Sequence, residues 1–455
     1  MKFRKFGKAL LISAATVGAV LCVTSCVQSY TVGFLYVTGN VTAETTGQGV
    51  ISGFKIDHNT GYLTPINGMP IASGGANPGR AVLLVGSRFF YVLNQGVDAS
   101  GGADCTSATN PCTGSVITLF AVGANGVLSV QPQQFYTQGH NPFRIVADSQ
   151  GNFIYVLDHD APDSGVGTSN SCTLALGPKF TTCGDITAFQ VNQTTGRLSL
   201  VINTQVSSAS GQPLPYFPVP PNSIDMLLSS SYMLVLSGTP ASGDIVFPYA
   251  YASTTGQLTA SQNGAQPLNI FESTALQLGS QFVYVLDNEP ITADGITSPS
   301  QIIPFTVGTG GALQAQTGGA VPDDPTMSNP QFLLVESKGK WVYVANTGDN
   351  QSQSNQQSGI AGYIIDTTTQ QLTNMPGGTF RFIPGSPFGS GAGPQCLVED
   401  PSDQFIYTAN YNSSSVTGLA LDQNAGVLKT LPGKANRSYS LSGPAAYCVV
   451  NGRTS

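Results

Sequence analysis

The sequence contains few charged residues. Asp, Glu, Lys and Arg make up 9% of its 455 residues, and the formal net charge is −7. Without a basic stripe to neutralise phosphates, a nucleic-acid partner is not expected. Stretches with the 3.6-residue apolar period of surface helices are also scarce. Gly is abundant at 53 residues and Pro at 29, so the composition indicates an all-β protein.

The N-terminus lacks an apolar run of the roughly 20 residues that a spanning helix needs. A shorter run from Ala9 to about Val23 follows a basic segment, as in a signal peptide. The run ends in Val23-Thr24-Ser25-Cys26, which resembles a bacterial lipobox and predicts lipidation of Cys26. An ordinary signal peptide with an incidental Cys26 is the alternative. We expect export and lipid anchoring in the bacterial cell envelope, at the outer membrane or facing the periplasm.

Eight cysteines are present, and export permits disulfides. Two pairs are close in sequence, each within a long Gly/Ser/Thr-rich loop that a covalent link would order. We therefore predict the disulfides Cys105–Cys112 and Cys172–Cys183, with free thiols as the alternative. Cys396 and Cys448 lie in apolar strand patterns and are predicted to be small core residues.

An internal repeat defines the fold. An aromatic or aliphatic residue precedes an apolar run, often Tyr-Val, which ends at Asn or Asp. Each copy is followed by alternating apolar and small residues, a turn at Gly and a resumption at Leu. A further strand precedes each copy and often begins with Asn-Pro or Gly-Pro. The copies begin at Phe34, Phe90, Phe153, Tyr232, Phe282, Trp341 and Phe405.

Four antiparallel strands in each of seven units predict a seven-bladed β-propeller. The chain enters at the second strand of a unit, at Phe34, and ends on an unpaired first strand, Gly443 to Val450. The C-terminal strand is therefore expected to complete the first blade, which leaves no open edge. A series of unrelated β domains would not explain these matching ends. The predicted organisation is signal peptide 1–25, anchor linker 26–33, propeller 34–450 and tail 451–455.

The Tyr-Val-x-Asn copies and Thr-Gly-x-Leu turns resemble those of lactonase-type seven-bladed propellers, which include bacterial 6-phosphogluconolactonase. The resemblance covers about Phe34 to Val450 and implies the fold and a lactone-hydrolysing activity. Family members typically have a His-x-His pair, then Asp-Pro and Gly, at one strand start. This chain has Asn141-Pro142-Phe143 there and retains only the later Asp148 and Gly151. The missing histidines place the activity in doubt.

In a propeller, the starts of the innermost strands converge on one channel mouth. Counting back from the Tyr-Val landmark selects Asn222, Glu272, Gln331 and Gln395 as channel-lining residues. Arg80 and Arg144 occupy the neighbouring positions and are candidates for binding an anion. Their alternative role is a structural bridge between blades.

Only three histidines are present: His58, His140 and His159. His159 lies between two aspartates at a strand end on the loop-rich face and could act as a base. Its alternative is a solvated loop position, whereas His58 is expected at the surface and His140 near the mouth. Oxygen-rich loops after Asp158 and Asp287 copy no recognised calcium loop, so neither a metal nor a cofactor is predicted.

Two functions remain open at this stage. One is a non-catalytic envelope protein that binds a small polar or anionic ligand, an envelope protein or a glycan. The other is a hydrolase of a sugar lactone, in which Glu272 or His159 activates water and Arg80 and Arg144 hold the anion. Anchoring and the missing histidine pair favour the binding protein, which we expect to be a monomer.

Overall fold

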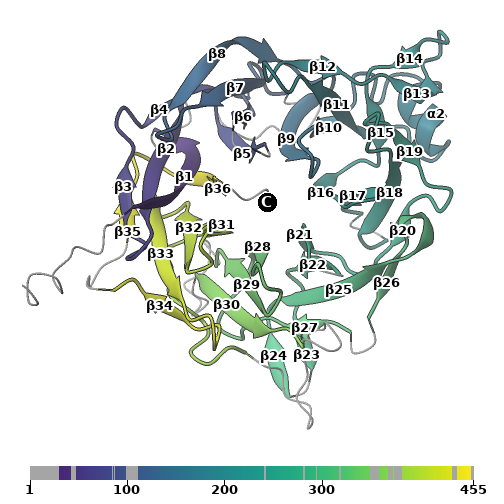
Figure 1. Ribbon diagram of the computed structural model, residues 1–455. Coiled ribbons are helices and arrows are strands. Elements are labelled where there is room, and N and C mark those ends of the chain that lie inside the picture. The colour runs from purple at the N-terminus through teal and green to yellow at the C-terminus, as the bar shows by residue number, and fades with distance from the viewer. Residues whose placement is uncertain are drawn as a thin grey trace, which may run out of the picture.

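The computed structural model describes residues 30–41, 48–84, 86, 88–98, 111–239, 242–279, 282–293, 295–316, 319–348, 358–366, 372, 382–432 and 438–451. Its strands form seven antiparallel blades around a central axis, as Figure 1 shows. The predicted all-β seven-bladed propeller is therefore confirmed. No helix within these ranges is long and apolar enough to cross a membrane. Below, the strands of each blade are named A to D from the axis outward.

The first four blades follow the chain from the N-terminus. Blade 1 contains β36 (Ala445–Val450), β1 (Thr31–Asn40), β2 (Gln48–Asp57) and β3 (Leu63–Pro65), with β4 (Ile71–Ala76) also paired to β2. Blade 2 contains β5 (Pro78–Leu83), β6 (Phe89–Asn94), β7 (Val116–Val122) and β8 (Leu128–Phe135). Blade 3 contains β9 (His140–Ala147), β10 (Phe153–Asp160), β11 (Gly184–Val191), β12 (Leu198–Leu200) and β15 (Phe217–Val219). Blade 4 contains β16 (Ser223–Leu228), β17 (Tyr232–Ser237), β18 (Ile245–Tyr251), β19 (Leu258–Ala260) and β20 (Gln266–Pro267).

The remaining three blades complete the ring. Blade 5 contains β21 (Ser273–Leu278), β22 (Val283–Asp287), β25 (Gln301–Val307), β26 (Leu313–Ala315) and β27 (Val321–Pro322). Blade 6 contains β28 (Pro330–Val335), β29 (Trp341–Asn346) and β30 (Gly359–Ile364). Blade 7 contains β31 (Pro394–Glu399), β32 (Phe405–Asn410), β33 (Ser415–Leu421), β34 (Leu428–Thr430) and β35 (Ser438–Ser440). Two small hairpins, β13 (Asn203–Ser207) with β14 (Pro213–Leu214) and β23 (Ile291–Ala293) with β24 (Ile296–Ser298), lie outside the blades, as do α2 (Ser171–Leu176) and the 3₁₀ turn η1 (Thr309–Gly311).

The A strands of successive blades contact one another in a closed ring, from β36 through β5 and on to β31, which meets β36 again. Strand β36 pairs antiparallel with β1, so the two ends of the chain share blade 1. Figure 1 shows the purple N-terminal and yellow C-terminal strands side by side. The predicted closure is thus confirmed. Each A strand runs from the face that carries the B–C loops, the loop face, to the face that carries the A–B hairpins, the hairpin face.

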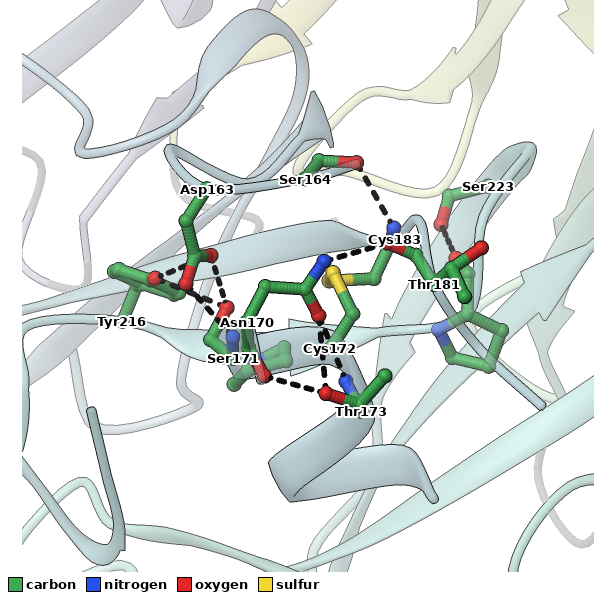
Figure 2. The surroundings of a disulfide bond; sticks show 12 residues. Asp163, Ser164, Asn170, Ser171, Cys172, Thr173, Thr181, Cys183, Tyr216 and Ser223 are labelled. Carbon is green, nitrogen blue, oxygen red and sulfur yellow. Dashed lines mark hydrogen bonds between the residues drawn. A yellow bond between two sulfur atoms is a disulfide. The ribbon is translucent and has the colours of Figure 1, made fainter. Parts of the chain in front are cut away.

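The long B–C loop of blade 3 contains α2 and the disulfide Cys172–Cys183, whose Cα atoms are 5.5 Å apart. This predicted disulfide is confirmed. Figure 2 shows how Asp163 orders the loop: its carboxylate accepts hydrogen bonds from the Ser171 backbone N–H and hydroxyl and from the Tyr216 hydroxyl. The loop is therefore a packed substructure on the loop face.

The other cysteines require one correction. Cys396 and Cys448 are buried in A strands as predicted, but they form a second disulfide, with Cα atoms 6.0 Å apart. Their strands, β31 and β36, are neighbours in the ring although 52 residues separate the two cysteines. Cys112 is also disulfide-bonded. Because Cys105 lies outside the described residues, the pairing of these two remains a prediction, as does lipidation of Cys26.

Candidate functional site

A cavity of about 430 Å³ opens at the loop face, where the A strands begin. Five blades contribute the residue at the β-bulge that starts their A strand: Gly79, Phe143, Gln331, Gln395 and Ala446. The bulge re-aims a side chain at each strand start, which turns these positions toward the axis. The predicted convergence on a channel mouth is therefore present for Gln331 and Gln395.

Arg80 and Arg144 also line the cavity, and both contact Asp225 on β16. The Arg144 Nε donates to Asp225 Oδ1 at 3.0 Å, and Arg80 Nη2 lies 3.4 Å from Asp225 Oδ2. The Asp225 side chain is fully buried, whereas the two arginine side chains keep 15% and 23% exposure. Two guanidinium groups thus share one carboxylate, which leaves one positive charge facing the cavity.

Asp225 joins four blades at the axis. Besides the arginines of blades 2 and 3, its Oδ2 accepts a hydrogen bond from the Leu276 backbone N–H of blade 5 at 3.1 Å. Its Oδ1 accepts one from the N–H of Met226 in its own strand. The arginines therefore bridge blades and also line the mouth, and anion binding by them remains a prediction.

Aromatic rings hold the arginines in place. The Arg144 guanidinium lies 5.1 Å from the centroid of Phe143, and that of Arg80 lies 5.6 Å from the centroid of Tyr447. His159 stacks on Phe143 with centroids 3.7 Å apart, so it lies beside the mouth without lining the cavity. Burial, followed by the charge of Arg144, lowers the pKa of His159 to about 4. Burial, followed by the charge of Arg80, also lowers the pKa of Arg144, to about 10.

Amide and hydroxyl groups form the rest of the wall. Gln95, Asn329, Thr347, Tyr411 and Asn412 line the cavity with the two predicted glutamines. Gln331 Nε2 donates to Asn329 Oδ1 at 2.7 Å, and this bond does not use the Gln331 side-chain oxygen. Amides and hydroxyls both donate and accept hydrogen bonds, so this wall suits a hydroxylated ligand. Gln95, Thr347 and Tyr411 directly follow the Asn that ends a Tyr-Val copy, and Asn329 begins an Asn-Pro strand start. The count was made along the first strands only, which is why these residues were missed.

Asn222 and Glu272 do not line this cavity. The prediction that they occupy the same strand position as Gln331 and Gln395 is therefore wrong for both. Each is exposed and precedes the bulge of its strand by two residues; the bulges fall at Ile224 and Thr274. Glu272 contributes backbone contacts only: its N–H donates to Asp287 Oδ1 at 3.2 Å. Its carboxylate is therefore not one of the cavity walls, and its catalytic role remains a prediction.

The error in the count comes from hairpin length. Arg144 pairs with Leu157, thirteen residues later, but Asp225 pairs with Leu236, only eleven residues later. Blade 5 has the same short spacing, from Ala275 to Leu286. A constant count therefore overshot by two residues in these blades and hid Asp225, which occupies the same strand position as Arg144. The short Ser-rich hairpin at Ser229 was the sequence signal that could have revealed it.

Several carboxylates outside the mouth are buried and accept hydrogen bonds within the blades. Asp287 accepts from Gln301 Nε2 at 2.7 Å, and burial raises its pKa to about 6. Asp158 and Asp185 face each other across β10 and β11, and burial raises both of their pKa values. Within the described ranges, no group of three or more His, Cys, Asp and Glu side chains could hold a metal ion.

Residues 301–444 match the family described as lactonase, 7-bladed beta-propeller. The fold is shared with the periplasmic gluconolactonase PpgL of Pseudomonas aeruginosa at 16% identity and a TM-score of 0.60, over 92% of this chain and 98% of that one. A candidate 6-phosphogluconolactonase of Bacteroides uniformis is similar at 14% identity and a TM-score of 0.59, over 92% and 99%. No curated protein sequence matches the chain. The resemblance to lactonase-type propellers is thus confirmed in residues 301–444 by sequence and over the whole ring by fold.

Proposed function

We propose that the protein binds a small hydroxylated anion, such as a sugar acid, at the loop-face mouth. The observation that carries this proposal is the shared carboxylate of Arg80, Arg144 and Asp225, which leaves one guanidinium charge uncompensated. A partly buried arginine forms strong hydrogen bonds to a carboxylate, and the surrounding amides would bind hydroxyl groups. Among the lining residues described, none is a carboxylate or a histidine, which favours binding over turnover.

The test is the affinity for gluconate, measured by isothermal titration calorimetry on wild type, Arg80→Gln and Arg197→Gln. Hydrogen bonds to charged groups contribute about 1.5–3 kcal/mol, so Arg80→Gln is expected to weaken binding at least about tenfold. Arg197 is exposed in a C–D hairpin on the opposite face and serves as the matched control. Equal affinities in all three proteins would contradict the proposed site.

A second candidate is hydrolysis of a sugar lactone, which the family match and the names of the two neighbours support. In this candidate the arginines would stabilise the oxyanion of the tetrahedral intermediate, and Glu272 or His159 would activate water. A base with a pKa of about 4, as for His159, is weak at neutral pH.

Turnover of glucono-δ-lactone by wild type, Glu272→Gln and His159→Gln decides between the two candidates. Loss of turnover in one variant would identify the base, and turnover unaffected by Glu272→Gln would remove that residue from catalysis. No turnover by the wild type with gluconate still bound would leave the binding function alone.

We also propose that the protein is exported and anchored by a lipid on Cys26. Two disulfides within the described residues support export, because disulfides persist in oxidising compartments, and one structural neighbour is named periplasmic. An envelope protein or glycan remains a further candidate partner of the loop face. Incorporation of labelled palmitate into wild type but not into Cys26→Ser tests the anchor.

A further inference from the structure

The central channel changes character from one face to the other. At the hairpin face, where the A strands end, a second cavity of about 290 Å³ lies among β21, β28, β31 and β36. Its walls are mostly aliphatic, and Leu278, Leu334, Val335, Val398 and Val450 belong to them. The Leu278 side chain is 48% exposed. The channel therefore has a polar mouth at one end and an apolar mouth at the other.

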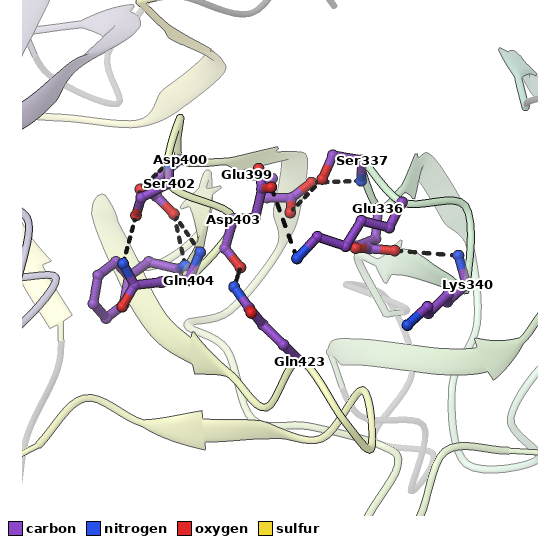
Figure 3. Close-up of polar contacts among 11 residues, drawn as sticks. Glu336, Ser337, Lys340, Glu399, Asp400, Ser402, Asp403, Gln404 and Gln423 are labelled. Atoms are coloured by element: carbon purple, nitrogen blue, oxygen red, sulfur yellow. Dashed lines mark hydrogen bonds and ion pairs between the residues drawn. The ribbon is translucent and has the colours of Figure 1, made fainter.

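The apolar mouth has a polar rim, and Figure 3 shows its hydrogen bonds in blades 6 and 7. Glu399 is the acidic residue among the cavity walls, and its carboxylate accepts hydrogen bonds from the Ser337 N–H and hydroxyl at 2.8 and 3.3 Å. Lys338 and Lys340, in the adjoining hairpin, are exposed. Lys338 lies 3.9 Å from Asp403, and the carboxylates of Glu336 and Glu399 accept hydrogen bonds in the same hairpins, so the rim carries both signs of charge. The aliphatic wall of the hollow is therefore the feature that fits an acyl chain.

The N-terminal end of β1 emerges on this same face. Strand β1 is antiparallel to β36, and Leu35 pairs with Val450 at the apolar mouth, so Thr31 extends beyond it. Tyr30 is 55% exposed and stacks on His58 of a C–D hairpin. A chain that enters at Thr31 therefore reaches the ring from the hairpin face.

The length of the tether restricts how the ring can sit on a membrane. Thr31 lies five positions after Cys26, and a fully extended chain over five positions spans at most about 18 Å. Strand β1, which runs from the hairpin face to the loop face, has 10 residues and a length of about 33 Å. A lipid on Cys26 could not reach past the height of the blade, so the loop face cannot rest on the bilayer.

We infer that the hairpin face rests on the membrane, that its apolar mouth receives an acyl chain of a bilayer lipid, and that the ligand mouth faces away from the bilayer. This inference rests on the proposed lipid anchor. The tether alone would also allow the outer rim of the ring to rest on the bilayer. The apolar mouth favours the hairpin face, because burying an acyl chain against aliphatic walls is favourable. The sugar-acid site would then open toward the aqueous compartment.

Amine footprinting by mass spectrometry tests the orientation. The full-length anchored protein is reconstituted in vesicles of phosphatidylglycerol and phosphatidylcholine, and Cys26→Ser in solution is the reference. Lys338 and Lys340 are expected to react several-fold more slowly on vesicles. Lys179, exposed in the blade 3 loop, is expected to react equally in both.

If wild-type protein does not float with the vesicles, the anchor proposal fails and the orientation fails with it. If it floats but Lys338 and Lys340 react as fast as in solution, the anchor stands and the orientation is overturned. Protection of Lys179 instead would also overturn it.

The single tryptophan, Trp341, reports contact of the hairpin face with acyl chains, and its ring packs on Gly426 beside the apolar mouth. Trp341 begins β29 next to the hairpin that follows Val335, and its carbonyl accepts a hydrogen bond from the Glu336 N–H. Vesicles with brominated acyl chains are expected to quench its fluorescence. Leu278→Asp should reduce that quenching at least twofold, because a charge at the mouth excludes the chain.

Leu174→Asp is the matched control, since Leu174 is 50% exposed but lies on α2 at the loop face. Quenching that is equal in Leu278→Asp, Leu174→Asp and wild type would overturn the acyl-chain site. The footprint would then still decide the orientation on its own.

Discussion

Asp225 is the residue on which the charge balance of the loop-face mouth depends most. Its buried carboxylate is the counter-charge for Arg80 and Arg144 and accepts the Leu276 N–H of another blade. We expect Asp225→Asn to lower the free energy of unfolding by about 2–3 kcal/mol, somewhat below the range of fully buried pairs because the arginines keep some exposure. Urea denaturation measures this loss. Asp422→Asn removes the charge of a half-buried partner of the exposed Lys429 and retains a side-chain oxygen for the turn, so a much smaller loss is expected.

Two of these three residues could be predicted from the sequence. Arg80 and Arg144 follow Asn-Pro strand starts and were identified with both of their possible roles. Asp225 was missed because its own strand starts with Asn222-Ser223 instead of Asn-Pro and the hairpin that follows is two residues shorter. The charge balance of the mouth depends on which residues meet across blades, which a repeat count cannot supply when one repeat changes length.

A second residue-scale feature is the acid pair of blade 3. Asp158 and Asp185 are fully buried, and each has one carboxylate oxygen without a hydrogen-bond partner. Thr137 and Thr187 donate to the other oxygens, while Asp160 and Asp163 add negative charge nearby. Burial raises the pKa of both groups, so the folded state binds protons more tightly than the unfolded chain.

The sign of the pH dependence follows from that difference. Stability from this pair is complete below the ordinary pKa of aspartate and is lost as the pH rises through the raised values. Asp185→Asn should therefore raise the thermal midpoint at pH 8 more than at pH 5. Asp324→Asn, at another buried aspartate, is the comparison variant. A gain from Asp185→Asn that is equal at both pH values would refute the explanation.

At the scale of the element, one hydrogen bond explains why the repeat has its form. In five of the seven blades the Tyr of the Tyr-Val motif donates its hydroxyl to a Gly carbonyl in the C–D hairpin of the next blade. The pairs are Tyr36 to Gly126, Tyr91 to Gly196, Tyr155 to Gly256, Tyr343 to Gly426 and Tyr407 to Gly61. The Tyr-Val and Thr-Gly signals are thus two halves of one inter-blade contact.

The glycine in that contact has two requirements. Gly256 has φ of 70°, a conformation that side chains rarely adopt, and a Cβ there would lie 2.4 Å from the Phe153 ring. The aromatic residue that opens the repeat therefore packs flat on the neighbouring hairpin. Sequence periodicity revealed the strands, but it could not reveal that the motif and the turn belong to adjacent blades.

Tyr155→Phe isolates the hydrogen bond at one junction. The hydroxyl donates to the Gly256 carbonyl at 3.0 Å, and its loss leaves a buried acceptor unpaired. We expect a loss of about 1–3 kcal/mol in the free energy of unfolding, measured by urea denaturation. Tyr136 is 59% exposed, so Tyr136→Phe is the matched control and is expected to leave stability unchanged. Equal stability of the two variants would show that the junction depends on ring packing alone.

At the scale of the whole molecule, the ring is held closed by strand pairing and by a covalent bond. The matching fragments at the two ends of the sequence were enough to predict that β36 completes blade 1. They could not predict Cys396–Cys448, because the two cysteines become neighbours only when blade 7 meets blade 1. Proximity in the sequence found the loop disulfide Cys172–Cys183 and missed the one that closes the ring.

The closing disulfide should contribute to stability but should not be required for folding. A link between residues 52 positions apart lowers the entropy of the unfolded chain, which adds about 4 kcal/mol to the free energy of unfolding. The double variant Cys396→Ser/Cys448→Ser is therefore expected to unfold at lower urea, with a loss of about 2–4 kcal/mol and a cooperative transition retained. A similar variant at Cys172 and Cys183 alters only the blade 3 loop and is expected to lose less.

Removal of the last strand should have a qualitatively different effect. Deletion from Gly443 onward removes β36, whose residues Ala445, Tyr447 and Val449 are buried, and leaves β1 with an open inner edge. It also removes Cys448 and the contacts of β36 with β5 and β31, so blades 2 and 7 lose their neighbour on the axis.

We expect the truncated chain to show no cooperative urea transition and to aggregate, because an unpaired edge promotes association. Addition of a peptide of residues 443–451 during refolding should restore the transition in part. A truncated protein that keeps the wild-type midpoint would mean that blade 1 is stable without β36 and that the ring does not need to close.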